Sequence, residues 1–440
     1  MAAIATSPRP LETESPPKAS WSAEFPVANA ARIASRFDIA APIEAYDFAQ
    51  KGNINRHTFQ VESGTSDKSE YLLQQINQQV FVRPRNVMSA MTAVIDAQRE
   101  NLGSVPRELS EGWEAITLVA LKDGAPYLEM IDRRGVSYWR LMVKIADSIT
   151  FKSLKEIADV SERLRIASEA GRGLALFGDL TASVDVARLA NPLPGYRDTA
   201  LYYSQFYSVL EGNRTAGEAA KHLPTDAELL QSTGRHFLVH AGPETAQKRL
   251  NDPALKDFIM LARDESATGL RLATELASGA IRKVATHGDT KLDNFLFSAS
   301  TGRVKALVDL DTIMPQTWLA DWGDMARSLV NVAGEKEPDL SRVQVDMDIY
   351  KALARGFLGA AREVTPHEVD LMVDAVQALS LELGVRFMTD YLRGDNYFQL
   401  GPADPPDLNK TRGMVQLTLF QRLRDVEAEC RAVIKAAAKG

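Results

Sequence analysis

The sequence has little of what marks disulfide-rich, membrane-spanning or nucleic-acid-binding proteins. It contains one cysteine, Cys430, among 440 residues, which excludes a disulfide within the chain and a multi-cysteine metal site. Its apolar runs stay below the roughly 18–20 residues that a membrane span needs. Acidic residues outnumber basic ones by 58 to 51, so the formal charge is −7 and the basic excess typical of nucleic-acid binding is missing. We therefore expect a cytoplasmic protein that binds neither nucleic acid nor a membrane.

The first 24 residues lack any regular pattern. Residues 1–24 hold Pro8, Pro10, Pro16 and Pro17, and no basic start precedes an apolar stretch. This predicts a disordered tail rather than a secretory signal. The whole chain has an ordinary globular balance, with 45% hydrophobic and 25% charged residues.

Two regions of different pattern follow the tail. Residues 25–145 predict a sheet-rich N-lobe, and residues 146–440 predict a mainly helical C-lobe that begins with a long helix over 157–180. In the N-lobe we expect helices near 25–36 and 86–99, strands flanking a turn at 51–53, a strand at 71–77, and a strand pair formed by 113–121 and 126–130. Residues 412–437 predict one packed terminal helix. The fold class is α+β, with the active site in the cleft between the lobes.

The segment THGDTKLDNFLFSASTGRVKALVDLD, residues 286–311, carries the candidate chemistry. Asn294 follows Asp289 by five residues, and Asp309 follows Asn294 by fifteen. Phosphoryl transfer needs a carboxylate at the attacking hydroxyl, an amide oxygen facing a metal, and a second carboxylate returned by a hairpin. This spacing predicts Asp289 as catalytic base and Asn294 and Asp309 as Mg²⁺ ligands.

Two neighbours of Asp289 have expected supporting roles. Lys291 is predicted to stabilise negative charge on the transferred phosphoryl group. His287 is predicted to brace the loop rather than take part in the chemistry.

These residues resemble a known superfamily. HGDTKLDN with VDLD is similar to the aminoglycoside phosphotransferases and choline kinases, which have a protein-kinase-like two-lobe fold. RFMTDYLRGDNYF at 386–398 and DLDTIMP at 309–315 resemble the narrower group of bacterial N-acetylhexosamine 1-kinases. The resemblance implies ATP- and Mg²⁺-dependent phosphorylation of a small hydroxylated substrate. The best candidate is the anomeric C1 hydroxyl of an N-acetylhexosamine or related hexose, facing Asp289.

The same resemblance implies roles for residues further along the chain. Arg386 and Tyr397 would contact the sugar, and Asp324 would buttress the catalytic loop. Asp311 has an expected supporting role, and Asp321 is left open. Substrate specificity is expected to depend on residues 192–199 and 386–400.

The nucleotide side is carried by GNINRHT at 52–58, which resembles the phosphate-covering loop of the superfamily. Backbone N–H groups of Gly52, Asn53, Ile54 and Asn55 are predicted to cradle the phosphates. The linker at 144–151 is expected to bond the adenine edge.

One position departs from the kinase pattern. Kinases carry a lysine on the third strand that pairs with the phosphates and with a glutamate of the following helix. Here Gln74 or Gln75 stands there, and the helix at 86–99 shows no obvious glutamate. We expect Gln74 to contact the nucleotide without supplying charge.

Several alternatives remain. Another small alcohol, such as an aminoglycoside, an amino sugar or a choline-like compound, is the alternative acceptor. A non-catalytic nucleotide-binding regulatory protein is the alternative from a different class, motivated by the absent lysine. His236 and His240 have zinc-like spacing but no third ligand. Asp309-Leu310-Asp311 also resembles the D-x-D of nucleotide-sugar glycosyltransferases, although HGDTKLDN favours the kinase. The oligomeric state is not predicted.

Overall fold

The structure is a computed structural model. It describes residue 25 and residues 27–49, 52, 54–55, 57–65, 68–132, 135–398, 400–401 and 403–439. The predicted tail at 1–24 and Asn53 lie outside the described residues.

The N-terminal part is an antiparallel sheet with the strand order β1-β2-β3-β5-β4. Its strands are β1 (Ile43–Asp47), β2 (Thr58–Ser63), β3 (Ser69–Gln75), β4 (Leu128–Asp132) and β5 (Gly135–Val143). Phe59, Leu73 and Leu141 are aligned across β2, β3 and β5 and are buried together with α1 (Val27–Ala34). Alternate residues of a strand share a face, so this apolar row forms one core of the lobe.

Helix α2 (Pro84–Asn101) joins the sheet to the C-terminal part. Pro84 stands in its first turn, where a missing backbone N–H costs nothing. Val87, Met91 and Val94 recur at helical spacing and are fully buried, and the helix packs against α4 (Val160–Thr181). The short elements η1 (Leu102–Ser104) and α3 (Arg107–Ser110) follow it.

The strand pair predicted from 113–121 and 126–130 is wrong. β4 pairs with β5, and residues 113–121 form only isolated bridges, Leu118 with Met142 and Leu121 with Phe37. The apolar residues of 113–121 still lie beside β5, since Val119 N–H donates to the Leu141 carbonyl (2.8 Å). Residues 113–121 therefore pair with β5 only briefly and irregularly. The longer partner of β4 is β5 itself, a strand that was not predicted from the sequence.

The C-terminal part is mainly helical. Besides α4, its helices are α5 (Thr199–Leu210), α6 (Ala227–Thr233), α7 (Pro243–Leu250), α8 (Pro253–Asp264), α9 (Ser266–Gly269), α10 (Arg271–Ser278), α11 (Trp318–Val330), α12 (Met347–Leu358), α13 (Pro366–Asp370), α14 (Met372–Arg393), α15 (Leu408–Asp425) and α16 (Glu427–Ala437), with short η2 (Leu154–Glu156), η3 (Gly234–Phe237) and η6 (Leu340–Arg342). Nearly every residue of α14 is buried, because α5, α11 and α15 pack around it. The single terminal helix predicted over 412–437 is two helices. α15 packs along α14, and after Val426 the chain turns so that α16 packs on α12.

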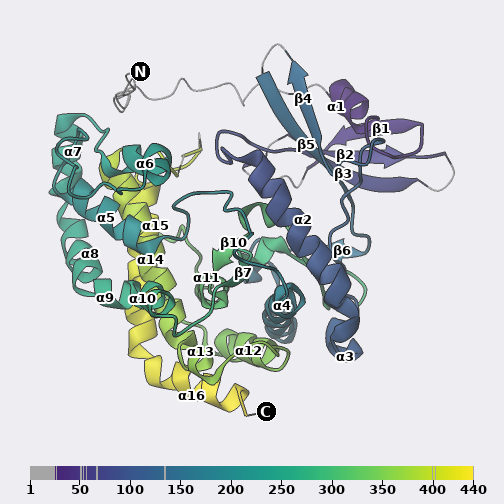
Figure 1. Cartoon of the computed structure of the whole chain (residues 1–440). Coiled ribbons are helices and arrows are strands. Elements are labelled where there is room, and N and C mark those ends of the chain that lie inside the picture. The colour runs from purple at the N-terminus through teal and green to yellow at the C-terminus, as the bar shows by residue number, and fades with distance from the viewer. Residues whose placement is uncertain are drawn as a thin grey trace, which may run out of the picture.

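Small sheets lie between the two parts. β7 (Val284–Thr286) pairs with β10 (Met314–Gln316), and β8 (Phe295–Ser298) pairs with β6 (Ser148–Ile149) and β9 (Val304–Leu307). Figure 1 shows the five-stranded sheet at one end, helices α5 to α10, α14 and α15 at the other, and β7, β10 and α11 between them. The predicted α+β two-lobe fold is confirmed, whereas the domain boundary at 145/146 stays a prediction. Among the described residues, no helix is long and apolar enough to cross a membrane.

Candidate functional site

The predicted catalytic loop begins where β7 ends. The buried His287 donates from Nε2 to the Val308 carbonyl (2.8 Å), and its Nδ1 accepts the backbone N–H of Asp289 (3.3 Å). This pair of bonds assigns the proton to Nε2 of a neutral ring, and burial lowers the pKa of His287 accordingly. His287 therefore lies where a bracing residue is needed, with no ring nitrogen left for proton transfer.

Asp321, in the first turn of α11, holds the backbone of this loop directly. Its carboxylate accepts the N–H groups of His287 (2.7 Å) and Gly288 (2.8 Å). Burial raises the pKa of Asp321 to about 7 although these bonds act in the opposite direction. Gly288 has φ +81°, and an added Cβ would stand 2.7 Å from the Thr312 carbonyl oxygen, so only glycine fits this turn. Asp321, which the sequence left open, thus holds the loop through two backbone N–H groups.

Asp324 lies one turn further along α11 and acts together with Arg197. It accepts from Arg197 (2.6 Å) and Arg327 (2.5 Å), and also from the backbone N–H of Thr290. Burial would raise the pKa of Asp324, but the two guanidinium groups outweigh it and lower that pKa to about 2. Arg197 also donates to the Gly288 carbonyl (3.0 Å) and pairs with Glu382 on α14 (3.1 Å). Sequence reasoning missed Arg197, although it placed 192–199 near the acceptor.

Three of the residues predicted to carry the chemistry, Asp289, Lys291 and Asn294, lie close together in the loop that Asp321 and Asp324 hold. Lys291 Nζ lies 2.9 Å from Asp289 Oδ2. Asn294 Nδ2, in η4 (Leu292–Asn294), donates to the Asp289 carbonyl (2.7 Å) and lies 3.2 Å from Asp289 Oδ2. Burial would lower the pKa of Lys291, but the carboxylates of Asp289, Asp293 and Asp309 raise it. Lys291 therefore stays charged.

Asp309 stands at the turn between β9 and η5 (Leu310–Thr312), in the left-handed backbone region with φ 65° and ψ 53°. Asp309 is exposed, although the surrounding chain crowds its carboxyl group, and it forms no ion pair among the described residues. Desolvation and then repulsion from Asp311 and Asp289 raise its pKa to about 7, while Lys291 and Arg140 act against this. A carboxyl group in such a position is stabilised as an anion by a bound cation.

The donor set fits a divalent metal shared with phosphates. Because Asn294 gives its Nδ2 to Asp289, its amide oxygen is the atom left to bind a cation, beside the unpaired Asp309. In the part of the chain that is described, no three His, Cys, Asp or Glu side chains form a ready cluster. Mg²⁺ is often held by one or two protein oxygens with phosphates and water completing its shell, so two ligands suffice.

On the nucleotide side, Asn55 and Gln74 are drawn into a buried network with Asp311. Asp311 accepts from Asn55 Nδ2 (2.5 Å) and pairs with Arg140 of β5, which also donates to Gln74 Oε1 (3.1 Å). Gly52 is exposed and shows no left-handed backbone, and Ile54 is exposed as well. Sequence reasoning missed Arg140; the signal was a charged residue inside the apolar run YWRLM.

Arg386 of α14 lies among aromatic rings on the other side of the loop. Its guanidinium carbon is 4.5 Å from the ring centre of Tyr202, 5.3 Å from Tyr196, and 5.6 Å from Tyr397. Tyr196 also donates to the Gly288 carbonyl (2.9 Å), which places this aromatic group next to Asp289. Arg386 is buried and has no carboxylate within ion-pair distance among the described residues.

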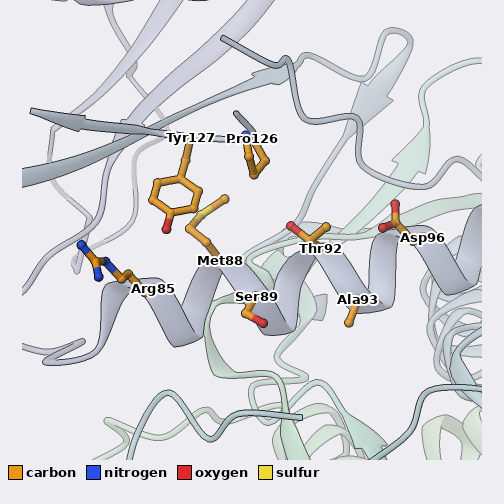
Figure 2. A pocket seen from close by; sticks show the side chains of 8 residues that line it. All are labelled: Arg85, Met88, Ser89, Thr92, Ala93, Asp96, Pro126 and Tyr127. Carbon is orange, nitrogen blue, oxygen red and sulfur yellow. The ribbon is translucent and has the colours of Figure 1, made fainter. Parts of the chain in front are cut away.

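Two other features do not join the site. His236 and His240 do not share a regular helix: His236 lies in η3 and His240 donates to the Arg235 carbonyl (2.9 Å), so the dismissed zinc pair finds no support. An open hollow of about 380 Å³ lies between α2 and the segment before β4. Figure 2 shows the side chains that line it. The hollow is lined by Arg85, Met88, Ser89, Thr92, Ala93, Asp96, Pro126 and Tyr127, none of which is a predicted site residue.

Comparison with known proteins gives one sequence family and several distant structures. Residues 47–346 match the family described as "Phosphotransferase enzyme family". A microcompartment-associated aminopropanol kinase is similar with a TM-score of 0.48 and 13% identity, covering 92% of this chain and 98% of that one. An ethanolamine kinase of Plasmodium vivax has 0.42 and 12%, covering 86% and 82%. A choline kinase of Cryptosporidium parvum has 0.43 and 13%, covering 90% and 94%. The substrates in these names are those of the proteins compared.

Proposed function

Since the chain belongs to the phosphotransferase enzyme family, we propose that it is a small-molecule kinase of the aminoglycoside phosphotransferase and choline kinase type and that its acceptor is a neutral sugar. The proposed reaction transfers the γ-phosphate of ATP to the anomeric C1 hydroxyl of an N-acetylhexosamine or related hexose. Kinases of this family use ATP with a divalent metal, and we propose Mg²⁺ for this one.

The Arg386 guanidinium, which donates to the Tyr397 hydroxyl (3.4 Å) but has no carboxylate partner among the described residues, is the observation that carries the choice of a neutral acceptor. Tyr196 links it to Gly288, beside the proposed base Asp289. A cationic acceptor such as choline would place like charges near one another. At about 5 Å and an effective dielectric of about 20, two like charges repel by about 3 kcal/mol, which is about a hundredfold in affinity. Sugar hydroxyl and amide oxygens accept from a guanidinium, and aromatic rings pack on a sugar's apolar face.

In the proposed mechanism Asp289 orients the acceptor hydroxyl and takes its proton. Asn294 donates from Nδ2 to Asp289, and its amide oxygen would face the metal. This arrangement would keep the base next to the phosphate. Lys291, 2.9 Å from Asp289, neutralises charge that builds up on the transferred group. Asn294 and Asp309 would hold the divalent metal, which when bound neutralises phosphate charge. Transfer of this kind depends mainly on positioning and charge, and these residues supply both.

The test is ATP consumption with Mg²⁺ across free hexoses, N-acetylhexosamines, aminoglycosides and choline. We expect turnover with an N-acetylhexosamine or hexose, and release of phosphate from the product by mild acid, because an anomeric phosphate is acid-labile. Turnover confined to choline or an aminoglycoside would keep the kinase assignment and refute the neutral-sugar acceptor.

Arg386→Met offers a second check on the acceptor side. We expect KM for the acceptor to rise at least about tenfold, since a charged hydrogen bond contributes roughly 1.5–3 kcal/mol, with KM for ATP unchanged. Arg424→Met is the control, because Arg424 also lies over an aromatic ring, that of Phe420 (5.8 Å), but on the outside of α15. Equal acceptor KM values in the two variants would show that Arg386 does not face the acceptor.

A further inference from the structure

We propose that Arg140 on β5 replaces the lysine that other kinases carry on β3, and that it positions the nucleotide hairpin against the metal-binding loop. The inference rests on the proposed function, because it concerns how MgATP is held. It answers the departure noted at Gln74, where a neutral residue occupies the place of the phosphate-pairing cation.

The strand register places the two residues side by side. Gln74 of β3 and Arg140 of β5 are directly paired in the antiparallel ladder, so their side chains leave the same face of the sheet. Arg140 donates from Nε (3.1 Å) and from Nη2 to Gln74 Oε1. The guanidinium therefore lies over the end of the Gln74 side chain, within the reach of a lysine at position 74. The positive charge therefore comes from β5 instead of β3, and it lies where the side chain of a lysine on β3 would end.

The carboxylate that pairs with this cation also comes from a different element. In kinases with the strand lysine it is a glutamate of the following helix. Here α2 presents Met91, whose Sδ lies 3.3 Å from Arg140 Nη1. The carboxylate comes instead from Asp311, two residues after Asp309, and both partners of this ion pair are about 2% exposed. The ion pair therefore connects the sheet to the metal-binding loop rather than to α2.

Five residues close this contact into a ring of hydrogen bonds. Arg140 bonds Gln74 Oε1, Gln74 Nε2 donates to Thr58 Oγ1 (3.0 Å), and Thr58 Oγ1 donates to the Asn55 carbonyl (2.7 Å). Asn55 Nδ2 then donates to Asp311 Oδ2 (2.5 Å), and Asp311 Oδ1 pairs with Arg140. The ring joins β2, β3 and β5 to η5.

The ring acts on the nucleotide indirectly. Arg140 is 1% exposed and its donors are already shared between Gln74 and Asp311, so it is a positioning residue rather than a phosphate ligand. Asn55 belongs to the segment predicted to cover the phosphates, and Asp311 follows the predicted metal ligand Asp309. Without the guanidinium, the buried Asp311 side chain keeps Asn55 as its remaining partner among the described residues, and the hairpin and the metal loop lose their common anchor.

The experiment compares the full-length wild type with Arg140→Gln, with the double variant Arg140→Gln/Gln74→Lys, and with Arg172→Gln. Arg172 is a matched control, because it is 7% exposed and pairs with Glu169 (2.7 Å) within α4, away from the ring. MgATP affinity is measured by calorimetry, KM and kcat by ATP consumption, and folding by thermal melting.

We expect Arg140→Gln to weaken MgATP binding and raise its KM at least about tenfold, the scale of a small misplacement of reacting groups, with the acceptor KM unchanged. The double variant returns a cation to the same place from β3 and is expected to recover most of this loss. Arg172→Gln is expected to lower the melting temperature without changing MgATP affinity.

Each other outcome refutes something specific. A wild type that neither binds MgATP nor consumes it refutes the proposed function and this inference with it. A functional wild type whose MgATP affinity survives Arg140→Gln refutes the inference alone. A loss of affinity that Arg172→Gln reproduces, or that Gln74→Lys does not repair, shows that Arg140 contributes only to folding.

Discussion

Replacing Asp289 by asparagine is expected to lower kcat by about 10²- to 10⁴-fold, the usual contribution of a positioned general base. The amide cannot take the proton of the acceptor hydroxyl, and the negative charge facing Lys291 Nζ at 2.9 Å is lost. The fold should be unaffected, because the Asp289 side chain is 30% exposed and its contacts are confined to its own loop. ATP consumption with the best acceptor and thermal melting measure the two effects separately.

Asp293→Asn is the matched control for this experiment. Asp293 lies in the same loop between Lys291 and Asn294, and its main-chain carbonyl accepts from Thr150 (3.0 Å), a contact that the substitution leaves in place. We expect its kcat to fall far less than that of Asp289→Asn, because the Asp293 carboxylate acts on Lys291 through its charge and those of Asp289 and Asp309 remain. If Asp289→Asn retains full turnover, the base lies elsewhere. If no acceptor supports turnover by the wild type, the alternative of a regulatory nucleotide-binding protein gains ground.

The catalytic loop could be predicted from sequence because its members are close in the chain. Asp289 and Asn294 are five residues apart, and the hairpin β8-β9 needs only a short segment to return Asp309. The structure brings these three residues together, while their roles in catalysis stay predictions. The catalytic and metal-binding residues of phosphoryl transfer come here from one short segment, so their spacing can be recognised in a single stretch of sequence.

Arg140 could not be predicted in the same way. β5 is buried on both faces over Tyr138 to Leu141, so its sequence lacks the alternation that identifies a half-exposed strand. The partner Asp311 lies 171 residues further along the chain. Arg197 presents the same difficulty, since its partners Asp324 and Glu382 come from two different helices. Contacts of this kind follow from the tertiary assembly rather than from a local pattern.

Arg197→Met is expected to give the largest loss of stability among these substitutions. The guanidinium is about 4% exposed and pairs with Asp324 (2.6 Å) and Glu382 (3.1 Å). Its removal leaves the buried Glu382 with no ion-pair partner among the described residues, and Asp324 with Arg327 as its remaining one. Breaking a buried pair in this way typically costs about 3–5 kcal/mol. The loop is affected as well, because Arg197 donates to the Gly288 carbonyl (3.0 Å). Methionine keeps a long unbranched side chain at φ 58°, so the change removes the charge and leaves the backbone demand similar.

The control is Arg188→Met, because Arg188 is 88% exposed and pairs with its exposed neighbour Asp185 (3.3 Å). A surface change of this kind should alter the free energy of unfolding by no more than about 0.5 kcal/mol. Urea denaturation of both variants and the wild type supplies the comparison. A loss no greater in Arg197→Met than in Arg188→Met would mean that the buried cluster adds nothing to stability.

The stability lost in Arg197→Met is expected to depend on pH in a definite direction. In the wild type the pKa of Asp324 is lowered to about 2, so its ionised form stabilises the fold above the ordinary aspartate pKa, and that contribution disappears as the pH falls toward 2. In Arg197→Met the Asp324 carboxylate loses one of the two guanidinium groups that lower its pKa, so the folded state takes up this proton at a higher pH than the wild type does. The stability difference between variant and wild type should therefore narrow as the pH falls from about 4 toward about 2. A difference that stays constant over this range would attribute the loss to packing rather than to uncompensated charge.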